Sequence, residues 1–483
     1  MTVTTPDPRR WWALAIIAIA QFVVIMDTSI IGVALPQIQR AVGFSQADLS
    51  WVFNAYVIAL GGLLLFGGRL ADLYGARRTF LIGFAVLGGA SAVTGLATSD
   101  AVLLVGRALQ GAGSALIAPA ALTMLMTLFA HDGRELTRAL ALYGAAPPAG
   151  GTAGVFLGGV LTASIDWRWV FLVNVPVAIL VLAAGRGLLP IGSRRPGRLD
   201  IAGALAVTAA LSLTVFGIVR GPIIGWTSAA TIGSLVVAAG LFVVFVRLQA
   251  MTSEPLMRLG IWRAPNLAAA NVSMALLGAA WIPAWFFLNL YLQQVRGFGA
   301  FAGGLALVPM TLTIMVLMVG VTGRIVGRYG FTRPLIAGLL ILAAGIGWLS
   351  VAPADGSYLW SILPATLVAA TGMSLAYIPA MLAALAGARP EEGGLAAGIV
   401  NTTYQGGSAL GLAVVTAVAT AGGFGGSGAP DAGFGTAFIA AAAIAVVGAG
   451  TAALALRRPA AVPTPAMAPA MAPATEGQAG YAD

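Results

Sequence analysis

Two charged residues lie deep inside long apolar segments of the 483-residue sequence, where a charge is costly and usually functional. Asp27 is the one acid placed in this way, and Arg107 is the one arginine. A carboxylate in such a segment can take up and release a proton, and a nearby cation tunes that equilibrium. The alternative is a permanent structural ion pair. Polar neighbours of the two charges, including Gln21 and Gln110, indicate a water-filled cavity and favour proton exchange.

A second set of residues has the composition of a binding site for a flat, amphipathic organic molecule. Trp281, Trp285, Asn289 and Gln293 recur at every fourth position, so they share one face of a helix. Aromatic rings with a few amides are typical of small-molecule sites, but tryptophans also anchor helices at membrane interfaces, and both interpretations stay open. Further polar residues in apolar segments are candidates to line the same cavity: Gln21, Asn54, Gln110, Asn401, Tyr404 and Gln405.

A third pattern consists of glycines. Gly150, Gly154 and Gly158 recur at four-residue spacing, Gly159 adjoins them, and a pair of prolines precedes them. This spacing places the glycines on one helix face, where another helix can approach closely. The residues alone favour ordinary tight packing.

The elements that position these residues must be membrane-spanning helices. The chain is 59% hydrophobic and only 8% charged, with a mean hydropathy of +0.95, whereas a soluble domain carries about 25% charged residues. A spanning helix needs about 20 apolar residues. About fourteen such runs follow one another in the sequence. We therefore predict an all-α polytopic membrane protein.

Arginine positions orient the predicted helices, because cytoplasmic loops carry an excess of positive charge. All 25 basic residues are arginines, and with the N-terminus inside, 20 fall in inner loops and tails and 4 in outer loops. Both termini are therefore predicted to be cytoplasmic. At 1.5 Å per residue, Asp27 lies roughly 24 Å from the inner end of its helix and Arg107 roughly 9 Å from the outer end. Both then lie in the outer half of a core about 30 Å thick, so we expect them to be neighbours.

Several kinds of chemistry are excluded by what the sequence lacks. There is no cysteine, which removes disulfides, iron–sulfur clusters and thiol catalysis. The single histidine, His131, lies in a polar break, so no metal site is expected, and the absence of lysine excludes a P-loop. No basic patch is long enough for nucleic acid. We expect neither an enzyme nor a cofactor.

A charged, glycine-punctuated loop at residues 67–78 recurs at residues 323–333, with Gly, Arg, Tyr, Gly and a final Arg at the same spacing. A repeat of this kind is typical of transporters built from two duplicated halves. Polar, basic breaks near residues 190–200 and 251–265 isolate two helices between the halves. We predict a six-helix half at 1–190, two extra helices at 191–265, a second six-helix half at 266–456, and a disordered cytoplasmic tail at 457–483.

These features resemble the major facilitator superfamily, in particular its fourteen-helix drug:proton antiporter branch, from about Trp12 to Ala455. The loop at 67–78 is similar to the family signature between helices 2 and 3, although Leu73 and Ala76 replace usually basic residues. The stretches that begin at Asp27 and Arg107 are similar to the helix 1 and helix 4 motifs, and residues 166–176 also fit the branch.

The resemblance implies a role for each motif. Asp27 and Arg107 would couple transport to protons, and a conformational gate would be formed by Gly68, Asp72, Gly75 and Arg78. The segment Gly154 to Gly159 is similar to the antiporter motif, with Val155 where a proline is expected. Relatives that export multivalent cations carry further acids in the helices of the second half, and none is found in those helices here, so a doubly charged substrate is not expected.

We therefore expect a proton-coupled exporter of amphipathic, neutral or weakly charged organic compounds, such as antibiotics, dyes or secondary metabolites. It would work as a monomer in the bacterial inner membrane, with lipid and the substrate as its partners and the proton as its coupling ion. One alternative is a proton symporter that imports a small nutrient or siderophore. Another is a non-transporting membrane sensor.

Overall fold

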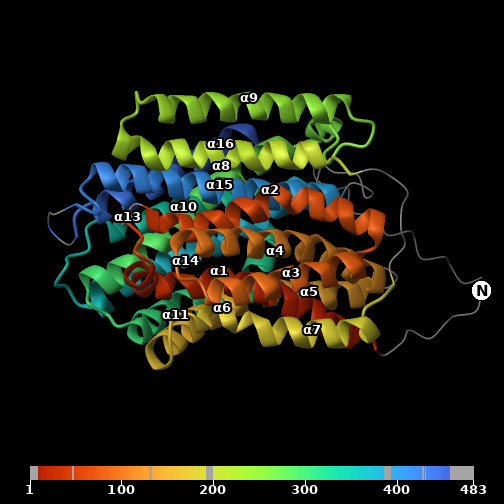
Figure 1. Ribbon diagram of the computed structural model, residues 1–483, viewed down its shortest axis with the longest axis horizontal. Coiled ribbons are helices and arrows are strands. Elements are labelled where there is room, and N and C mark those ends of the chain that lie inside the picture. The colour runs from red at the N-terminus through yellow and green to blue at the C-terminus, as the bar shows by residue number, and fades with distance from the viewer. Residues whose placement is uncertain are drawn as a thin grey trace, which may run out of the picture.

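The computed structural model describes residues 9–45, 48–129, 133–191, 199–385, 393–426, 429 and 431–456. Within these ranges every regular element is a helix, and the helices run alongside one another as a bundle (Figure 1). The predicted all-α class is confirmed. His131 and the predicted tail at 457–483 lie outside the described residues.

The first part of the chain forms six passes through the bundle. They are α1 (Arg10–Val42), α2 (Trp51–Tyr74), α3 (Ala76–Gly95), α4 (Asp100–Phe129), α5 (Gly133–Ser164), and a sixth pass made of α6 (Trp169–Leu172) and α7 (Asn174–Leu188). A short 3₁₀ turn, Asp48–Ser50, precedes α2. Two further helices follow as a hairpin: α8 (Ile201–Ile224) and α9 (Ala229–Met251).

The last part of the chain forms six more passes, several of which contain a π-helical turn. They are α10 (Leu267–Leu290) extended by Tyr291–Val295, α11 (Ala300–Leu317) joined through Met318–Thr322 to α12 (Gly323–Tyr329), α13 (Thr332–Leu349), α14 (Leu363–Leu385) preceded by Tyr358–Ile362, α15 (Gly393–Ala421) and α16 (Phe434–Ala455).

The number of spanning helices agrees with the sequence prediction. Among the described residues, 12 helical segments are long and apolar enough to cross a membrane. The two other long helices, α5 with 32 residues and α15 with 29, are richer in glycine and polar residues. They pack along α1 and α10 as parts of the same bundle. The 12 segments together with α5 and α15 give fourteen long helical segments among the described residues. We call the end at which α1 begins the inner end, following the predicted topology.

The first six passes and the last six meet along several pairs of helices, and three of these contacts lie at a glycine. The backbone of α5 at Val155 lies against Gly304 of α11, and α2 at Gly61 lies against Gln405 of α15. Between α1 and α10, the indole of Trp285 fills the space beside Gly32, where a β-carbon would lie 2.4 Å from the ring. Each contact depends on a glycine, because any side chain would push the two helices apart.

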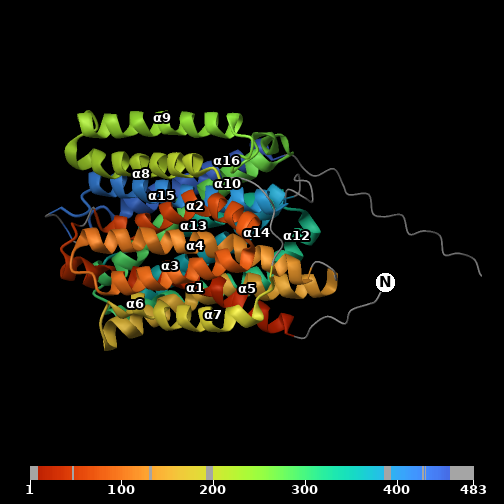
Figure 2. The ribbon, with the colours of Figure 1, turned by 45° about the vertical axis from the view of Figure 1, so that its right-hand side comes forward.

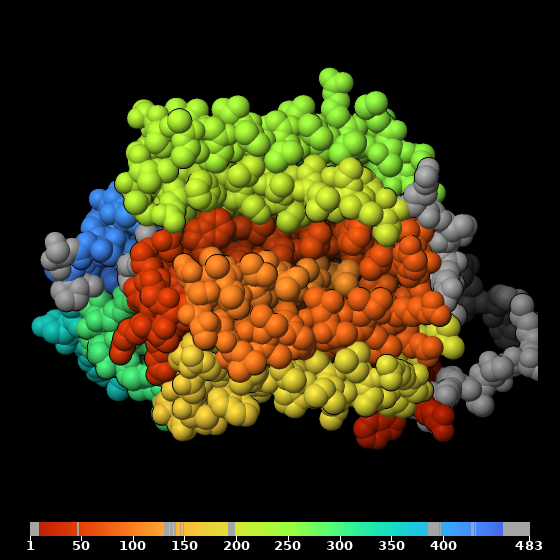
Figure 3. Space-filling model, viewed as in Figure 1, coloured from red at the N-terminus to blue at the C-terminus, as the bar shows by residue number. Residues whose placement is uncertain are grey.

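The α8–α9 hairpin covers one of these three contacts. Helix α8 packs against both α2 and α15, and α9 packs on α8 as the outermost layer (Figures 1, 2 and 3). Two ion pairs fix the hairpin and its linker to the first six passes. Arg69 bonds Glu254 at 2.5 Å near the inner end, and Arg220 bonds Asp48 at 3.3 Å near the outer end. The hairpin therefore lies over the α2–α15 contact while it is tied to the α2 side.

Candidate functional site

The predicted proximity of the two intramembrane charges is confirmed. Arg107 Nη1 donates to Asp27 Oδ2 at 2.5 Å, and both side chains are 0% exposed. Asp27 comes from α1 and Arg107 from α4, at matching depth in neighbouring helices. Two buried charges offset each other's desolvation only when their geometry is good and their remaining polar atoms are bonded. The shell around the pair therefore decides what the pair can do.

Three uncharged side chains complete the shell around Asp27. Asn174, the first residue of α7, donates from Nδ2 to Asp27 Oδ1 at 2.6 Å. Gln110 donates to the same oxygen at a longer 3.4 Å, and more closely to Ser91 Oγ at 2.7 Å. Both carboxylate oxygens thus accept hydrogen bonds, one from a guanidinium and one from amides. Side chains of the protein therefore hold the carboxylate on both sides.

Arg107 is held in a fixed orientation by a different set of groups. Its Nε donates to the Val52 carbonyl at 3.0 Å and its Nη1 also donates to Gln110 Oε1 at 3.0 Å. The ring of Tyr56 lies 4.4 Å from the guanidinium carbon, and that of Phe171 lies at 5.9 Å. Cation–π contacts of this kind strengthen where water is excluded. Nη2 has no hydrogen-bond partner among the described residues.

The predicted water-filled cavity around the pair is wrong for this structure. Asp27, Arg107 and Gln110 expose no surface. The hydroxyl of Thr28, next to Asp27 in α1, bonds the carbonyl of Ile25 in its own helix. Gln110 bonds both charges directly, whereas Gln21 bonds Tyr143.

The predicted glycine face on α5 positions the helix that carries Asp27. A β-carbon on Gly150, Gly154 or Gly158 would lie 2.4–2.8 Å from the carbonyls of Phe22, Met26 and Ile30 in α1. These three carbonyls are also four residues apart, so the two helices pack backbone to backbone on both sides of Asp27. Gly159 faces α11 instead, next to the carbonyl of Ala300. The tight-packing interpretation of these glycines is confirmed.

The predicted gate residues lie at the inner turn between α2 and α3. Gly75 adopts φ +94° and separates the two helices, which suits a glycine. The close approach of α2 to α4 depends on Gly67, whose β-carbon would lie 2.1 Å from the Ala115 carbonyl, whereas Gly68 has room for one. Asp72 is half-buried and Arg78 is exposed, and neither forms an ion pair with any described residue. The charge contact of this loop is made by Arg69 with Glu254.

The predicted aromatic stripe on α10 is buried in the bundle. Trp281 is 8% exposed and Trp285 is 7% exposed, so the interfacial-anchor interpretation is wrong for both. Trp285 packs on Gly32, and Asn289 donates to the carbonyl of Trp285 at 2.9 Å. Gln293 is half-buried, and its Nε2 has no partner in the described part of the chain. Of the four residues, Trp285 lies at the contact between α1 and α10, and Gln293 lies beside Gly303 of α11.

Two predicted cavity residues from opposite parts of the chain meet in a tyrosine cluster. Tyr143 of α5 donates to Gln21 Oε1 of α1 at 3.1 Å. Tyr377 of α14 lies close enough to interact with Tyr143. Its ring packs edge-on against Tyr404 of α15, with 5.5 Å between ring centroids. We call these four residues, Gln21, Tyr143, Tyr377 and Tyr404, the tyrosine cluster. It brings residues of α1 and α5 into electrostatic range of residues of α14 and α15.

The other predicted cavity residues are scattered along the same helices. Gln405 packs against Gly61 at the α2–α15 contact. Asn54 is 0% exposed, and neither of its amide atoms bonds any described residue. Asn401 is half-buried. The structure does not bring these three into contact with the Asp27–Arg107 pair.

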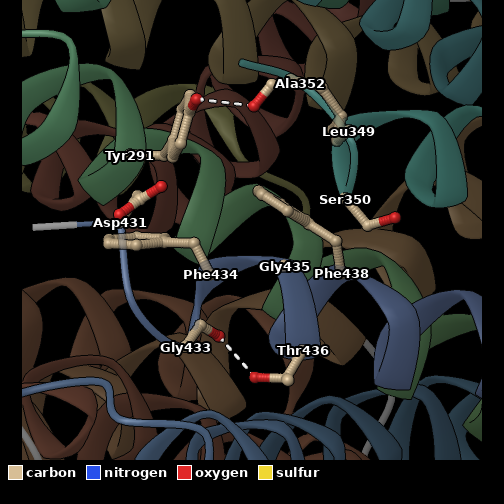
Figure 4. Close-up of a pocket in the computed structure, with 10 residues that line it drawn as sticks. All are labelled: Tyr291, Leu349, Ser350, Ala352, Asp431, Gly433, Phe434, Gly435, Thr436 and Phe438. Atoms are coloured by element: carbon tan, nitrogen blue, oxygen red, sulfur yellow. Dashed lines mark hydrogen bonds between the residues drawn. The ribbon is translucent and has the colours of Figure 1, made fainter. Parts of the chain in front are cut away.

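A pocket of about 270 Å³ at the outer ends of α10, α13 and α16 is a poor alternative site (Figure 4). None of the predicted site residues lines it. Two of its polar side chains are already bonded within the protein: the Tyr291 hydroxyl donates to the Ala352 carbonyl at 3.1 Å, and Thr436 Oγ1 donates to the Gly433 carbonyl at 2.8 Å. Among the described residues there is also no group of three side chains that could hold a metal ion.

Sequence reasoning missed Ser91, Asn174, Tyr143 and Tyr377 as site residues. Asn174 lies in the motif at residues 166–176, but the motif assigns it no role of its own. Each is a polar residue within an apolar helix, and that signal also marks many residues that bond their own backbone. Thr94, for example, donates to the Ala90 carbonyl at 2.7 Å in the same helix as Ser91. Spacing along one helix does not reveal which polar residues face another helix.

Comparison with known proteins agrees with this architecture. The family model of the Major Facilitator Superfamily matches residues 17–412. A crystal structure of the nucleoside transporter NupG is similar with a TM-score of 0.66, covering 92% of this chain and 99% of NupG. At 12% sequence identity, this similarity shows the fold alone.

Curated relatives are similar over most of their length. The cephamycin export protein CmcT of Amycolatopsis lactamdurans is 42% identical over 417 residues, which is 85% of each chain. The puromycin resistance protein pur8 of Streptomyces alboniger is 37% identical over 86% of this chain and 83% of its own. The tetracenomycin C resistance and export protein of Streptomyces glaucescens is 33% identical over 84% and 75%. The chain belongs to the Major Facilitator Superfamily of membrane transporters.

Proposed function

We propose that this transporter exports antibiotics or related amphipathic organic compounds in exchange for protons. The observation that carries the proposal is the fully buried Asp27–Arg107 pair, which is enclosed by amides and aromatic rings. A permanent pair of this kind contributes little net stability. A pair whose carboxylate gains and loses a proton gives the protein two states of different internal charge.

The export direction is supported by the relatives. Proteins at 42%, 37% and 33% identity are named for cephamycin export, puromycin resistance and tetracenomycin C resistance and export. The match of this chain to each of them extends through both sets of six passes. These names also suggest the class of substrate, which is a medium-sized organic molecule with polar groups.

The residues of the tyrosine cluster support a substrate that is neutral or weakly charged. Tyr143, Tyr377 and Tyr404 offer aromatic faces and hydroxyl groups, which suit a flat molecule with hydrogen-bonding edges. None of the helices numbered α10 to α16 contains an aspartate or a glutamate within its own bounds. A substrate with two positive charges would therefore find only Asp27 to neutralise it.

In the proposed cycle the two sets of six passes rock about a central site, which opens alternately to each side of the membrane. In the outward-open state Asp27 binds a proton, its attraction to Arg107 weakens, and substrate leaves. In the inward-open state Asp27 releases the proton, and the ion pair with its amide shell re-forms. One proton that moves down 100 mV supplies about 2.3 kcal/mol, which supports a substrate gradient of roughly fifty-fold.

The setting we propose is the bacterial inner membrane, with both termini in the cytoplasm and a single chain as the working unit. The arginine distribution supports this orientation, because 20 of the 25 arginines fall on the predicted inner side. Asp72 and Arg78 would act as a gate at that side, where the turn between α2 and α3 meets the cytoplasm.

Transport into inverted membrane vesicles tests the proposal. Puromycin, lincomycin, tetracenomycin C and a cephamycin serve as probes, and an imposed pH gradient, acidic inside, drives uptake. The wild-type protein should accumulate at least one probe, and Asp27→Asn should abolish the gradient-driven part. Thermal unfolding of the purified variant checks that it is folded.

The same probes separate export from the alternatives. Cells that make an exporter accumulate less of the probe than cells without it, and cells that make an importer accumulate more. Full gradient-driven uptake by Asp27→Asn would refute the proton role of this residue. A complete lack of transport across the panel would favour the sensor.

A further inference from the structure

The amide of Asn174 donates a short hydrogen bond to Asp27, the proposed proton carrier, while its oxygen accepts no hydrogen bond from any described residue. Its Nδ2 donates to Asp27 Oδ1 at 2.6 Å, on the carboxylate oxygen opposite the one that Arg107 holds. Asn174 is 1% exposed, and its Oδ1 has no hydrogen-bond partner among the described residues. An unpaired buried acceptor costs stability. Its presence beside an ionisable group therefore calls for a physical explanation.

The two ends of this amide match the two protonation states of a carboxyl group. An ionised carboxylate only accepts hydrogen bonds, whereas a protonated carboxyl has one O–H donor. Arg107 has only donors, so it cannot accept the O–H of the protonated state. Gln110 Oε1 already accepts from Arg107, and its Nε2 donates to Ser91. Among the described side chains that bond Asp27, Asn174 is the one with a vacant acceptor.

We infer that Asn174 is a positioning residue for the proton that Asp27 carries. When Asp27 is ionised, the amide donates from Nδ2 to the carboxylate. When Asp27 is protonated, the amide turns by half a rotation about its terminal bond, and Oδ1 accepts the new O–H. The inference rests on the proposed function, in which Asp27 is the proton carrier.

The geometry also assigns the oxygen that receives the proton. Asp27 Oδ2 is held at 2.5 Å by the guanidinium of Arg107, so its lone pairs are the less available. Asp27 Oδ1 faces only amides, at 2.6 Å from Asn174 and 3.4 Å from Gln110. A lone pair of Oδ1 takes a proton from a hydronium ion of the outer water, so one O–H bond forms on Asp27 while one O–H bond of the hydronium breaks and leaves a water molecule. Release on the inner side reverses this step.

The local backbone suits such a turn of the amide. Asn174 begins α7 directly after Val173, where α6 ends, so its side chain starts from a break in the sixth pass. The terminal torsion of asparagine is broad and close to two-fold, so the half-turn meets little intrinsic resistance. Nδ2 also lies 3.4 Å from Ser91 Oγ, a hydroxyl that can either accept or donate.

Few other ionisable groups face Asp27. Arg107 of α4 pairs with it, and Tyr56 of α2 lies over that guanidinium. Helices α6, α10 and α11, which also pack against α1, contain no charged residue. On α5 two ionisable groups contact α1: Tyr143 bonds Gln21, and Glu135 pairs with Arg10 at the inner end. The charged residues of α5 and α7 lie twelve or more positions nearer the inner end than Gly150 and Asn174: Arg134, Glu135, Arg138 and Arg186.

Infrared difference spectroscopy of the purified full chain in lipid vesicles, recorded between pairs of pH values, tests the inference without a substrate. The band of the protonated Asp27 carboxyl is identified by its loss in Asp27→Asn. Asn174→Leu keeps the size of the side chain but removes both amide groups. We expect the pH midpoint of the band to rise by about 1 unit, because the lost bond to the carboxylate is charge-assisted and stronger than the lost neutral bond. The C=O stretching frequency should shift as well.

Asn271→Leu is the matched control, since Asn271 is 2% exposed on a spanning helix and bonds Leu267 and Thr403. It should leave both the midpoint and the frequency of the Asp27 band unchanged. If Asn174→Leu does not fold, Asn174→Ser serves, because its hydroxyl replaces the amide acceptor and must still shift the C=O frequency.

The outcomes separate the two claims. An Asp27 band that keeps its midpoint and frequency in the folded Asn174 variant would overturn the positioning role and leave the proposed function intact. The absence of any Asp27-dependent band in the wild-type protein at every accessible pH would overturn the proposed function itself.

Discussion

At the scale of single residues, the site is a buried ion pair whose hydrogen-bond partners are other groups of the protein. Arg107 and Asp27 bond each other, and the remaining donors to the carboxylate come from Gln110 and Asn174. Such a pair is strongly coupled. Removal of one partner leaves an unpaired buried charge, whereas removal of both leaves a neutral site.

A double-mutant cycle should show this coupling in the stability of the protein. We expect Arg107→Met and Asp27→Asn each to lower the free energy of unfolding by about 3 kcal/mol, because each leaves one buried charge without its partner. The combined variant should recover most of that loss while it stays inactive in proton-driven transport. Denaturant-induced unfolding in detergent measures all four proteins. Additive losses in the double variant would show that the pair is not coupled in the folded state.

The sequence alone predicts the pair but not its shell, for a physical reason. An ionisable residue in an apolar helix is conspicuous, and its depth follows from the helical rise, so Asp27 could be matched to Arg107. Asn174 and Ser91 are not conspicuous, because serine, threonine and asparagine in spanning helices often bond their own backbone. Whether such a residue faces another helix depends on helix rotation, which packing sets.

At the scale of elements, the position of Asp27 depends on how closely α5 approaches α1. The backbone of α5 at Gly154 lies near the Met26 carbonyl and near Ser29, one on each side of Asp27 along the α1 sequence. The spacing of the glycines predicted a close contact, and α1 is the helix that fills it. The sequence could not name α1 as the partner, because a glycine face is equally complementary to many helices.

Substitutions on α5 should therefore differ sharply between its two faces. At Gly154 a β-carbon would lie 2.8 Å from the Met26 carbonyl, so Gly154→Ala should cost about 1–3 kcal/mol and slow transport. Gly144 lies on the same helix with nothing within 4 Å of a β-carbon, so Gly144→Ala should be neutral or stabilise by about 0.5–1 kcal/mol. Thermal unfolding and vesicle uptake of both variants provide the comparison. Equal effects would mean that the α1–α5 contact is not required.

The fold prediction succeeded at the same scale because hydropathy and arginine positions act on each helix independently. The fourteen runs correspond to fourteen long helices, including α5 and α15, which are the less apolar ones. The gate motif contains Gly68, but the glycine that packs closely against α4 is its neighbour Gly67. This difference shows the limit of a motif. A repeat marks the turn, but neighbouring residues decide which glycine faces α4.

At the scale of the whole molecule, the α8–α9 hairpin is tied to the first six passes at both ends. Arg69–Glu254 and Asp48–Arg220 make these ties, while α8 also touches α15 from the other set of passes. If the two sets rock against each other, α8 must move with α2 and slide on α15.

Cross-links in this cysteine-free chain can test that motion. An ideal β-carbon on Gly62 of α2 would touch Thr208 of α8. An ideal β-carbon on Gly406 of α15 would lie 3.9 Å from Cδ2 of Leu211 of α8. A disulfide between cysteines at 62 and 208 should leave vesicle uptake nearly unchanged. One between cysteines at 406 and 211 should block uptake until it is reduced. The reverse pattern would show that the hairpin moves with the second set of passes.

The hairpin also makes the two lateral walls of the transporter unequal toward the surrounding lipid. On one wall α8 and α9 lie over the α2–α15 contact as a double layer. On the other, Phe156 of α5 and Phe301 of α11 meet edge to edge and remain 42% and 43% exposed. A hydrophobic compound that has partitioned into the bilayer therefore meets two layers of helices on one side and the single layer of α5 and α11, with its exposed phenylalanines, on the other. We therefore expect lateral entry from the membrane to take place on the α5–α11 side.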